Sequence, residues 1–268
     1  TFHAPEEIHA LDHMLHDMRL YKSRSELAAM RRAARVAIEA HEEAMRICRP
    51  GMNEADIHAV LLQVFTRRHC EASYQPIVGG GANACVLHYI ANRDELGDGD
   101  LLLIDAGAEY DGYASDITRT FPVNGKFSSE QRDLYEVVLA AQAAALEQAR
   151  AGNQWQDVHQ AAVRAATEGM IELGILKNGL EEEIESEGYK KFYAHNTGHW
   201  LGLDVHDVGE YTIDGHSREL EPGMVLTVEP GIYIPAGSEG VDERWHGIGI
   251  RIEDDVAVTR EEPRILTD

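Results

Sequence analysis

Two short segments of this sequence match each other and lie nearly half a chain apart. Residues 99–107 read GDLLLIDAG and residues 223–231 read GMVLTVEPG, and the two align without gaps. In each segment an apolar run of strand character ends in a carboxylate, Asp105 or Glu229, and a glycine follows two residues later. A match this short can arise by chance, but an offset of nearly half the chain is what duplication of one α/β unit gives. We therefore expect an α+β fold with two pseudo-symmetric α/β halves.

Helical periodicity precedes each of these segments. Ser23 and Glu26 have capping-box spacing and open an amphipathic run that stops at the Pro-Gly pair of residues 50–51. Residues 1–22 carry only weak helical periodicity, and we interpret them as an N-terminal lead or linker before one domain over residues 23–268. Further helices are predicted over residues 53–68, 128–152 and 154–173.

The charge balance excludes several classes of partner. The chain has 47 Asp plus Glu against 24 Lys plus Arg, a formal net charge of −23. Nucleic acids and anionic membranes are bound largely through cationic residues, so neither is an expected partner. No stretch approaches about 18 consecutive apolar residues, and the cysteines match no zinc or redox spacing. We expect a cytoplasmic protein with reduced cysteines.

A second acid in a strand-like context follows each of the two matching segments. It is Asp116 in the first half and Glu253 in the second, and strand alternation places Arg251 on the same face as Glu253. A carboxylate at the end of a buried strand is costly unless it is paired or bound to a metal. If the two halves pack face to face, four carboxylates converge.

Three histidines lie between the halves. The glycine-rich segment HNTGHWLGLDVHDVG holds His195, His199 and His206. Oxygen donors with one imidazole favour Mn²⁺, Co²⁺ or Fe²⁺ over a structural zinc, and a catalytic Zn²⁺ remains an alternative. Four carboxylates carry too much charge for one divalent ion, whereas two bridged ions balance it and can hold a hydroxide that attacks a carbonyl. The pattern predicts a dimetal hydrolytic centre.

Four segments resemble the signature blocks of the pita-bread metallopeptidases, most closely the Xaa-Pro aminopeptidases, with the prolidases next. They are LIDAGAEYDGYASDITRTFPV, HNTGHWLGLDVHDVG, LEPGMVLTVEPGIYI and GIGIRIEDDVAVT. The resemblance covers about residues 15–260 and includes every metal-binding block in order. It implies a pita-bread fold whose two halves surround two divalent ions, usually Mn²⁺.

The resemblance also implies a role for each metal-binding position. Asp105 would bind one ion, His199 and Glu229 would bind the other, and Asp116 and Glu253 would bridge the pair. Glu229 would in addition pass a proton to the leaving nitrogen of proline.

Further residues match positions around the family's substrate cleft. His88, His195 and His206 correspond to histidines that hold the peptide and stabilise the charge on its scissile carbonyl. Arg251 either organises the site by pairing with a metal-site carboxylate or forms an ordinary cross-strand ion pair. Tyr233 either lines the proline pocket or is a core aromatic, which is the simpler interpretation.

The implied activity is removal of the N-terminal residue from peptides with proline in the second position, by attack of a hydroxide that bridges the two ions. A prolidase, which cleaves only Xaa-Pro dipeptides, and a methionine aminopeptidase are the alternatives among relatives. A catalytically inactive pita-bread module that binds peptides is the alternative from another class. Relatives of that kind lose metal ligands, whereas all five positions are filled here.

Two features depart from the family pattern. HNTGHWLG stands where relatives have HGLSHWLG or HGLGHxLG, so Asn196 and Thr197 alter the loop beside the histidines. Relatives ordinarily carry a separate N-terminal domain that helps to wall the cleft and contributes to oligomer contacts, and we expect it to be absent here. Activity and assembly into a homo-oligomer therefore need their own tests.

Overall fold

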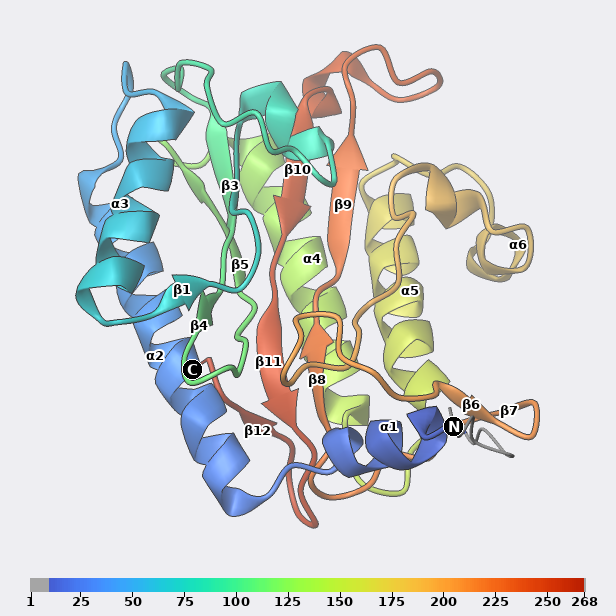
Figure 1. Cartoon of the computed structure of the whole chain (residues 1–268). Coiled ribbons are helices and arrows are strands. Elements are labelled where there is room, and N and C mark those ends of the chain that lie inside the picture. The colour runs from blue at the N-terminus through green and yellow to red at the C-terminus, as the bar shows by residue number, and fades with distance from the viewer. Residues whose placement is uncertain (1–9, 268) are drawn as a thin grey trace, which may run out of the picture.

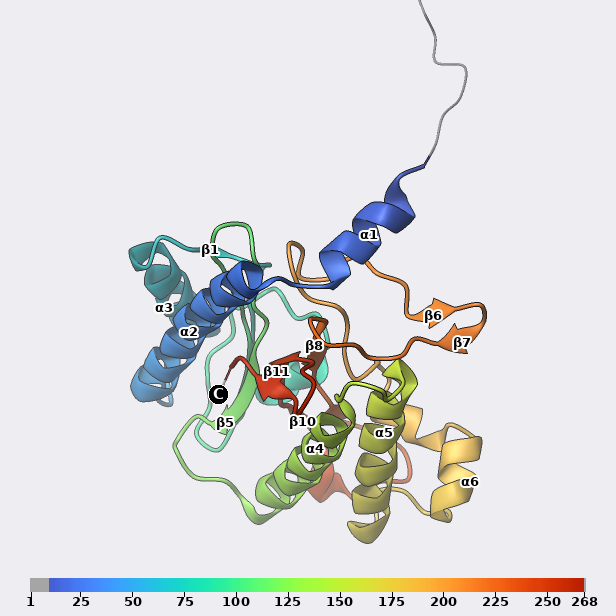
Figure 2. The ribbon, with the colours of Figure 1, turned by 90° about the horizontal axis from the view of Figure 1, so that it is seen from below.

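The computed structural model describes residues 10–267, so residues 1–9 of the expected lead lie outside the described part. Within the lead, α1 spans Asp12–Leu20, and Figure 2 shows it extending away from the rest of the chain. Its last residue, Leu20, is buried in the core of the second half. Across the described residues, no helix combines the length and apolar character that a membrane crossing needs.

Helices α2 and α3 pack on the strands of the first half (Figure 1). They span Arg24–Ile47 and Glu54–Arg67, in agreement with the sequence prediction. The predicted capping box is present, because the Ser23 side chain accepts from the backbone of Glu26 and the Glu26 carboxylate accepts from the backbone of Ser23. Asn53 caps α3 in the same way.

Helices α4 and α5 pack on the strands of the second half (Figure 1). α5 spans Trp155–Glu172, as predicted, whereas α4 spans Ser129–Gln148 and ends short of the predicted end at residue 152. In the turn that follows, Gly152 takes a positive φ of 93° and donates its N–H to the carbonyl of Leu220. A turn that joins the two helices thus replaces the last predicted helical turn.

The first half contains a three-stranded antiparallel sheet. Its order is β2 (Ile77–Gly80), β3 (Leu101–Asp105) and β5 (Thr118–Pro122), so β3 is the central strand. The register places Asp105 opposite Ile77 on one side and Thr118 on the other.

The second half also contains a three-stranded antiparallel sheet, in which the strand of the second matching segment lies at one edge. β8 (Val225–Val228) pairs with β11 (Asp254–Ala257), which pairs with β12 (Arg264–Ile265). β9 (Gly231–Ile234) pairs with β10 (Ile248–Arg251) in a separate antiparallel pair. Short elements complete the described chain: β1 (Glu71–Ala72) with β4 (Ala108–Glu109), β6 (Thr212–Ile213) with β7 (His216–Ser217), α6 (Leu180–Glu185), and the 3₁₀ turns η1 (Gly81–Cys85), η2 (Gly188–Lys191) and η3 (Glu243–Trp245).

The two matching sequence segments occupy equivalent places in the two halves. β3 is flanked by β2 and β5, and β8 is flanked by β11 and by the segment around Trp200, which bridges to Leu226. Each half also has its own pair of helices. The predicted α+β fold with two similar halves is therefore confirmed.

His41 is a buried histidine in α2 that supports the strand carrying Asp105. Its Nε2 lies 3.1 Å from the carbonyl oxygen of Ala106, which follows Asp105 directly, and its side chain is buried. Burial, with a contribution from the positive charge of Arg119, lowers the pKa of His41 to about 4. The folded chain therefore keeps His41 neutral, as an N–H donor to the Ala106 carbonyl.

We expect His41 to make folding sensitive to acid. The unfolded chain binds a proton at about pH 6.5 that folded His41 binds only near pH 4, so its contribution to the free energy of unfolding is present above pH 6.5 and lost as the pH falls to 4. In His41→Gln, the fall in unfolding free energy between pH 7 and 4.5 should be smaller by about 2 kcal/mol. Urea unfolding at both pH values measures this. The prediction would be contradicted if the unfolding free energy of His41→Gln fell as much as that of the unchanged chain. It would also be contradicted if His216→Gln, which changes a histidine on an exposed strand, reduced the fall equally.

Candidate active site

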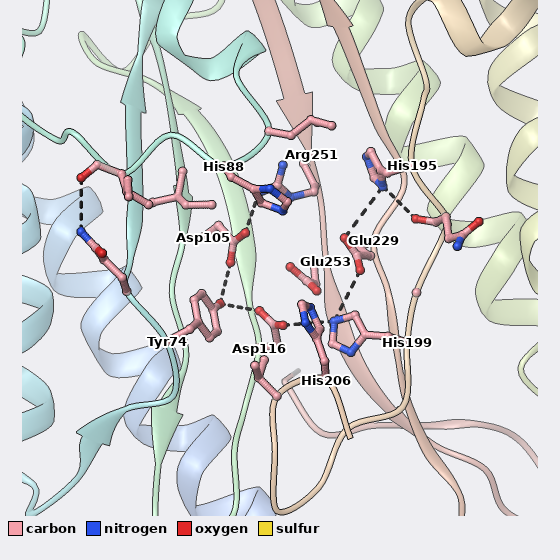
Figure 3. Close-up of a pocket in the computed structure, with 17 residues that line it drawn as sticks. Tyr74, His88, Asp105, Asp116, His195, His199, His206, Glu229, Arg251 and Glu253 are labelled. Atoms are coloured by element: carbon pink, nitrogen blue, oxygen red, sulfur yellow. Dashed lines mark hydrogen bonds and ion pairs between the residues drawn. The ribbon is translucent and has the colours of Figure 1, made fainter. Parts of the chain in front are cut away.

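A cavity of about 480 Å³ lies between the two halves (Figure 3). It brings together acids and histidines from strands and loops that are far apart in the sequence. The predicted site residues that line it are Asp105, Asp116, Glu229, Glu253, His88, His195, His199, His206 and Arg251.

Strand ends place the four carboxylates around this cavity. Asp105 is the last residue of β3 and Asp116 lies just before β5, while Glu229 follows β8 and Glu253 precedes β11. The turn between Asp105 and Asp116 depends on Gly107, because a Cβ there would lie 1.7 Å from the carbonyl oxygen of Ser115. The glycine that follows Asp105 by two residues therefore allows the two acids to approach.

The segment that carries His199 runs along the free edge of β8. The carbonyl of His199 accepts from the backbone N–H of Thr227 at 2.9 Å, and the carbonyl of Thr197 accepts from that of Glu229 at 2.8 Å. A Cβ on Gly198 would lie 2.0 Å from the carbonyl oxygen of Thr227, so this close approach requires glycine. His199 and Glu229 are thereby fixed side by side.

Three of the predicted ligands form one compact cluster. Asp116, His199 and Glu253 each offer a ligand atom within 4.8 Å of the other two. His199 Nε2 lies 3.4 Å from Asp116 Oδ2 and 3.6 Å from Glu229 Oε1. Asp105 joins the cluster through Tyr74, whose hydroxyl donates to Asp105 Oδ1 at 2.5 Å and also contacts Asp116 (Figure 3).

Arg251 pairs with a carboxylate of the cluster and also reaches two hydroxyl groups. Its Nη2 lies 2.5 Å from Asp105 Oδ2, its Nη1 donates to Tyr233 Oη at 2.8 Å, and its Nε donates to Thr118 Oγ1 at 3.1 Å. The Thr118 hydroxyl in turn donates to Glu253 at 2.6 Å. Of the two interpretations left open for Arg251, the structure has the pairing with a site carboxylate.

Burial and mutual repulsion disfavour the ionised forms of the acids in this cluster. Burial raises the pKa of Asp116 and Glu253, and repulsion from neighbouring carboxylates raises them further. The same two causes raise the pKa of Glu229 to about 7 and that of Asp255 well above its usual range. Asp255 Oδ1 is buried without a hydrogen-bond partner in the described part of the chain. Such a set of oxygen donors fits divalent cations, which would neutralise it.

The acids around His199 keep its imidazole protonated in the metal-free chain. Burial alone would lower its pKa, but the hydrogen bond and charge of Asp116, with the charge of Glu229, raise it to about 9. Without a metal, the imidazolium therefore balances part of the acidic cluster. A divalent cation in the same place would supply that balance instead, leaving Nε2 as a neutral donor atom.

His195 and Tyr233 hold each other at the edge of the cavity. His195 Nδ1 donates to the carbonyl of Asn196 at 2.7 Å, and its Nε2 accepts from the Tyr233 hydroxyl at 2.9 Å. Burial, together with the charge of Arg251, lowers the pKa of His195 to about 4, so this imidazole is neutral. Both ring nitrogens are thus occupied within the chain.

Tyr233 is not among the residues that line the cavity, and its predicted alternative as a wall of the proline pocket stays a prediction. Its ring is buried among Ile77, Ala84 and Leu103, behind Arg251. The core-aromatic interpretation holds for the ring, while the hydroxyl links Arg251 to His195.

The remaining predicted histidines lie at the rim. His88 and His206 are exposed and both line the cavity, and the His206 ring packs edge-on against His199 at 4.4 Å between centroids. Asn196 and Thr197, which depart from the family loop, have different surroundings. Asn196 lines the cavity, whereas the Thr197 hydroxyl points into the second half, 2.8 Å from Nδ1 of His159 in α5.

Sequence reasoning missed several residues of the site. Thr118 could have been found by alternation from Asp116, since both lie on one face of the same extended segment. Tyr74 has no such signal, because only the tertiary fold brings it between two acids. The cavity is also lined by Gln75, Ile77, Leu87, Ile90, Gly198 and Val205.

Comparisons with known proteins agree over nearly the whole chain. The sequence profile described as "Metallopeptidase family M24" matches residues 28–260. The Xaa-Pro aminopeptidase of Escherichia coli strain K12 is 51% identical over 92% of this chain and 56% of its own length. Xaa-Pro aminopeptidase 3 of Homo sapiens is 36% identical over 97% of this chain and 51% of its own. The chain thus spans just over half the length of these curated relatives.

Solved structures of two aminopeptidases superimpose closely on this chain. Aminopeptidase PepP of Pseudomonas aeruginosa superimposes with a TM-score of 0.97 at 53% identity, covering 99% of this chain and 60% of that one. Aminopeptidase P of Escherichia coli with the inhibitor Pro-Leu superimposes with a TM-score of 0.95 at 49% identity, covering 98% and 60%.

We expect Asp116→Asn to abolish metal binding without unfolding the chain. The substitution removes a central donor but keeps the shape of the side chain, and the loss of the ion pair with His199 should lower the unfolding temperature of the metal-free chain without unfolding it. Thermal unfolding with and without Mn²⁺, with metal analysis of the desalted protein, measures both effects. Asp111→Asn, on an exposed turn of the same hairpin, is the matched control and should keep the Mn²⁺-induced rise. A full rise in Asp116→Asn would show that this residue is not a ligand.

We expect Tyr233→Phe to destabilise the chain through Arg251. The loss of the hydroxyl leaves a buried Arg251 donor and His195 Nε2 without their partner, at a cost of about 1–3 kcal/mol. Denaturant unfolding compared with Tyr113→Phe, whose hydroxyl bonds the half-buried Glu26, provides the measurement. Equal losses in the two variants would mean that the Tyr233 hydroxyl is no more than an ordinary hydrogen-bonding group.

Proposed function

Because this chain belongs to metallopeptidase family M24, we propose that it is an Xaa-Pro aminopeptidase, a hydrolase that removes the N-terminal residue from peptides with proline in the second position. The observation that carries the proposal is the buried cluster of Asp116, His199 and Glu253, flanked by Asp105 and Glu229 in a cavity large enough for a small peptide. Its support is the likeness to Xaa-Pro aminopeptidases at about half identity.

The fold is the pita-bread fold, as the sequence resemblance predicted. Within it, the proposal treats residues 23–268 as the catalytic domain and residues 1–22 as the lead into it. This chain spans little more than half the length of its relatives. The activity of a full-length protein is therefore also part of the proposal.

The donor set is suited to two divalent ions, and we propose Mn²⁺. Asp105 would hold one ion, His199 and Glu229 the other, and Asp116 and Glu253 both, which uses every acid that lines the cavity. When bound, such ions lower the pKa of water and polarise a carbonyl. Arg251 and Thr118 keep Asp105 and Glu253 in fixed orientations, because each carboxylate receives a donor of its own.

Proton transfer falls to Glu229 in this proposal. Its carboxylate lies in the cavity, 3.6 Å from His199 Nε2, where it would take up a proton and pass it to the departing proline nitrogen. His88 and His206 lie at the exposed rim, where they would contact the peptide. His195 is a positioning residue, since its nitrogens are engaged by Asn196 and Tyr233.

Apolar residues supply the surface on which a proline ring would pack. Ile77, Leu87, Ile90 and Val205 line the same cavity as the carboxylates. A pyrrolidine ring buries apolar area without placing a donor against them, because proline has no N–H within a peptide bond. We therefore propose these four residues as contacts of the proline ring.

The proposal extends to setting and assembly. Cys48, Cys70 and Cys85 are unpaired, which fits the reducing cytoplasm. The surplus of acids fits a peptide substrate and no nucleic acid. A homo-oligomer remains a prediction.

The experiment compares matched peptides with the Mn²⁺-loaded chain. We expect release of the N-terminal residue from Ala-Pro-Ala and much slower cleavage of Ala-Pro and Ala-Ala-Ala. Chromatography of the products measures each reaction. Cleavage of Ala-Pro without cleavage of Ala-Pro-Ala would favour a prolidase. Release of Met from Met-Ala-Ala would favour a methionine aminopeptidase.

The inactive module makes a different prediction. It requires fewer than one Mn²⁺ per chain after loading and desalting, with no hydrolysis of any peptide. Asp111→Asn, which alters an exposed acid of the same hairpin, should keep the activity of the unchanged chain.

A further inference from the structure

Glu54 is a fully buried carboxylate that lies outside the cavity. It is the first residue of α3 and has 0% of its surface exposed. Its charge is met by hydrogen-bond donors at 2.7–3.0 Å: the backbone N–H groups of Gly80, Arg93 and Asp94, the side-chain amide of Asn83 and the hydroxyl of Tyr89. A buried ionised group needs such a set, because an unpaired one would cost several kcal/mol.

All of these donors belong to one stretch of chain, residues 80–94. After the 3₁₀ turn η1, residues 86–93 form no strand or helix, so no ladder of backbone hydrogen bonds fixes their position. Glu54 Oε1 receives donors from the beginning of the stretch, and Oε2 receives them from its middle and end. A single carboxylate thus holds both ends of the loop.

This loop forms one wall of the cavity. Leu87, His88 and Ile90 line it, and each lies within a few residues of a group that donates to Glu54. Figure 3 shows His88 among the side chains around the acidic cluster. The adjacent residue, Tyr89, is not among the residues that line the cavity, and its hydroxyl donates to Glu54 at 2.7 Å. A shift of Tyr89 would therefore move the backbone that carries His88.

We propose that Glu54 is a positioning residue that holds His88 in place over the cavity. This inference rests on the proposed function for its kinetic consequence. Asn92 is a second anchor of the loop, since its side chain bonds the backbone of Pro76 and Val78. Asn92 fixes the loop to β2, whereas Glu54 fixes it to α3.

Glu54→Gln tests the role with the smallest change in shape. Whichever way the amide is turned, its NH₂ group faces at least two donors that now lack an acceptor, so the loop must shift. Tyr89→Phe is the milder variant, because it removes one donor and leaves the others on the carboxylate. Glu183→Gln is the matched control: Glu183 is also buried and accepts a backbone N–H, but it lies in α6 away from the cavity.

The measurement is steady-state hydrolysis of Ala-Pro-Ala with and without His88→Ala. We expect Glu54→Gln to lower kcat by about tenfold or more, because a small displacement of a positioned group is enough for such a loss. In the His88→Ala background the same change should cost only about twofold, because the group it positions is gone. Metal content should stay unchanged, and Glu183→Gln should leave kcat unchanged. Equal losses in both backgrounds would overturn the proposal.

Amide hydrogen exchange separates this inference from the proposed function. Exchange over residues 81–93 should be faster in Glu54→Gln, less so in Tyr89→Phe and unchanged in Glu183→Gln. If the unchanged chain hydrolyses no Xaa-Pro peptide, the proposed function fails, and this exchange alone decides the positioning role. Unchanged exchange over the loop in Glu54→Gln would overturn it.

Discussion

Hydrogen bonds join β5 in the first half to the segment that runs from β10 into β11 in the second half. They set the spacing of the acids between the two halves. The carbonyl of Thr118 accepts from the backbone N–H of Glu253 at 3.1 Å. The hydroxyl of Thr120 accepts from the N–H of Arg251 at 3.2 Å and donates to its carbonyl at 3.0 Å. Because side chains alternate along a strand, a slip of one residue would turn Glu253 away from Asp116. The site therefore depends on this register more than on any single side-chain contact.

Two arginines cross the same boundary in opposite directions. Arg251, from the second half, reaches Asp105 in the first, and Arg119, from the first half, reaches Asp254 in the second at 2.7 Å. Arg119 also donates to the carbonyl of Glu253 at 2.6 Å. These contacts offset part of the acidic charge, but the pKa of Glu253 remains raised by burial and by nearby carboxylates. A site of this kind gains stability from bound cations, so metal binding and folding are coupled.

The main chain of the site could be predicted because local signals determine it. Capping boxes located the starts of α2 and α4, and the repeated segment located the strand ends that carry Asp105 and Glu229. Alternation placed Arg251 and Glu253 on one face, and the structure has both side chains in the same cavity. Each of these inferences needs only the period of a helix or strand and the cost of burying a charge.

The partners of these residues could not be predicted, because they depend on how the halves pack. Alternation assigns a residue to a face of a strand, but both faces of β9 are buried, so the pattern does not tell whether Tyr233 meets a cavity or a core. Tyr74 lies far from its two acids in the sequence and becomes their neighbour only in the folded chain. Glu54 reads as an ordinary acid in the first turn of a helix, where a negative charge is favourable in any case. Its role appears only when an irregular loop, which has no period to predict, folds its donors onto one carboxylate.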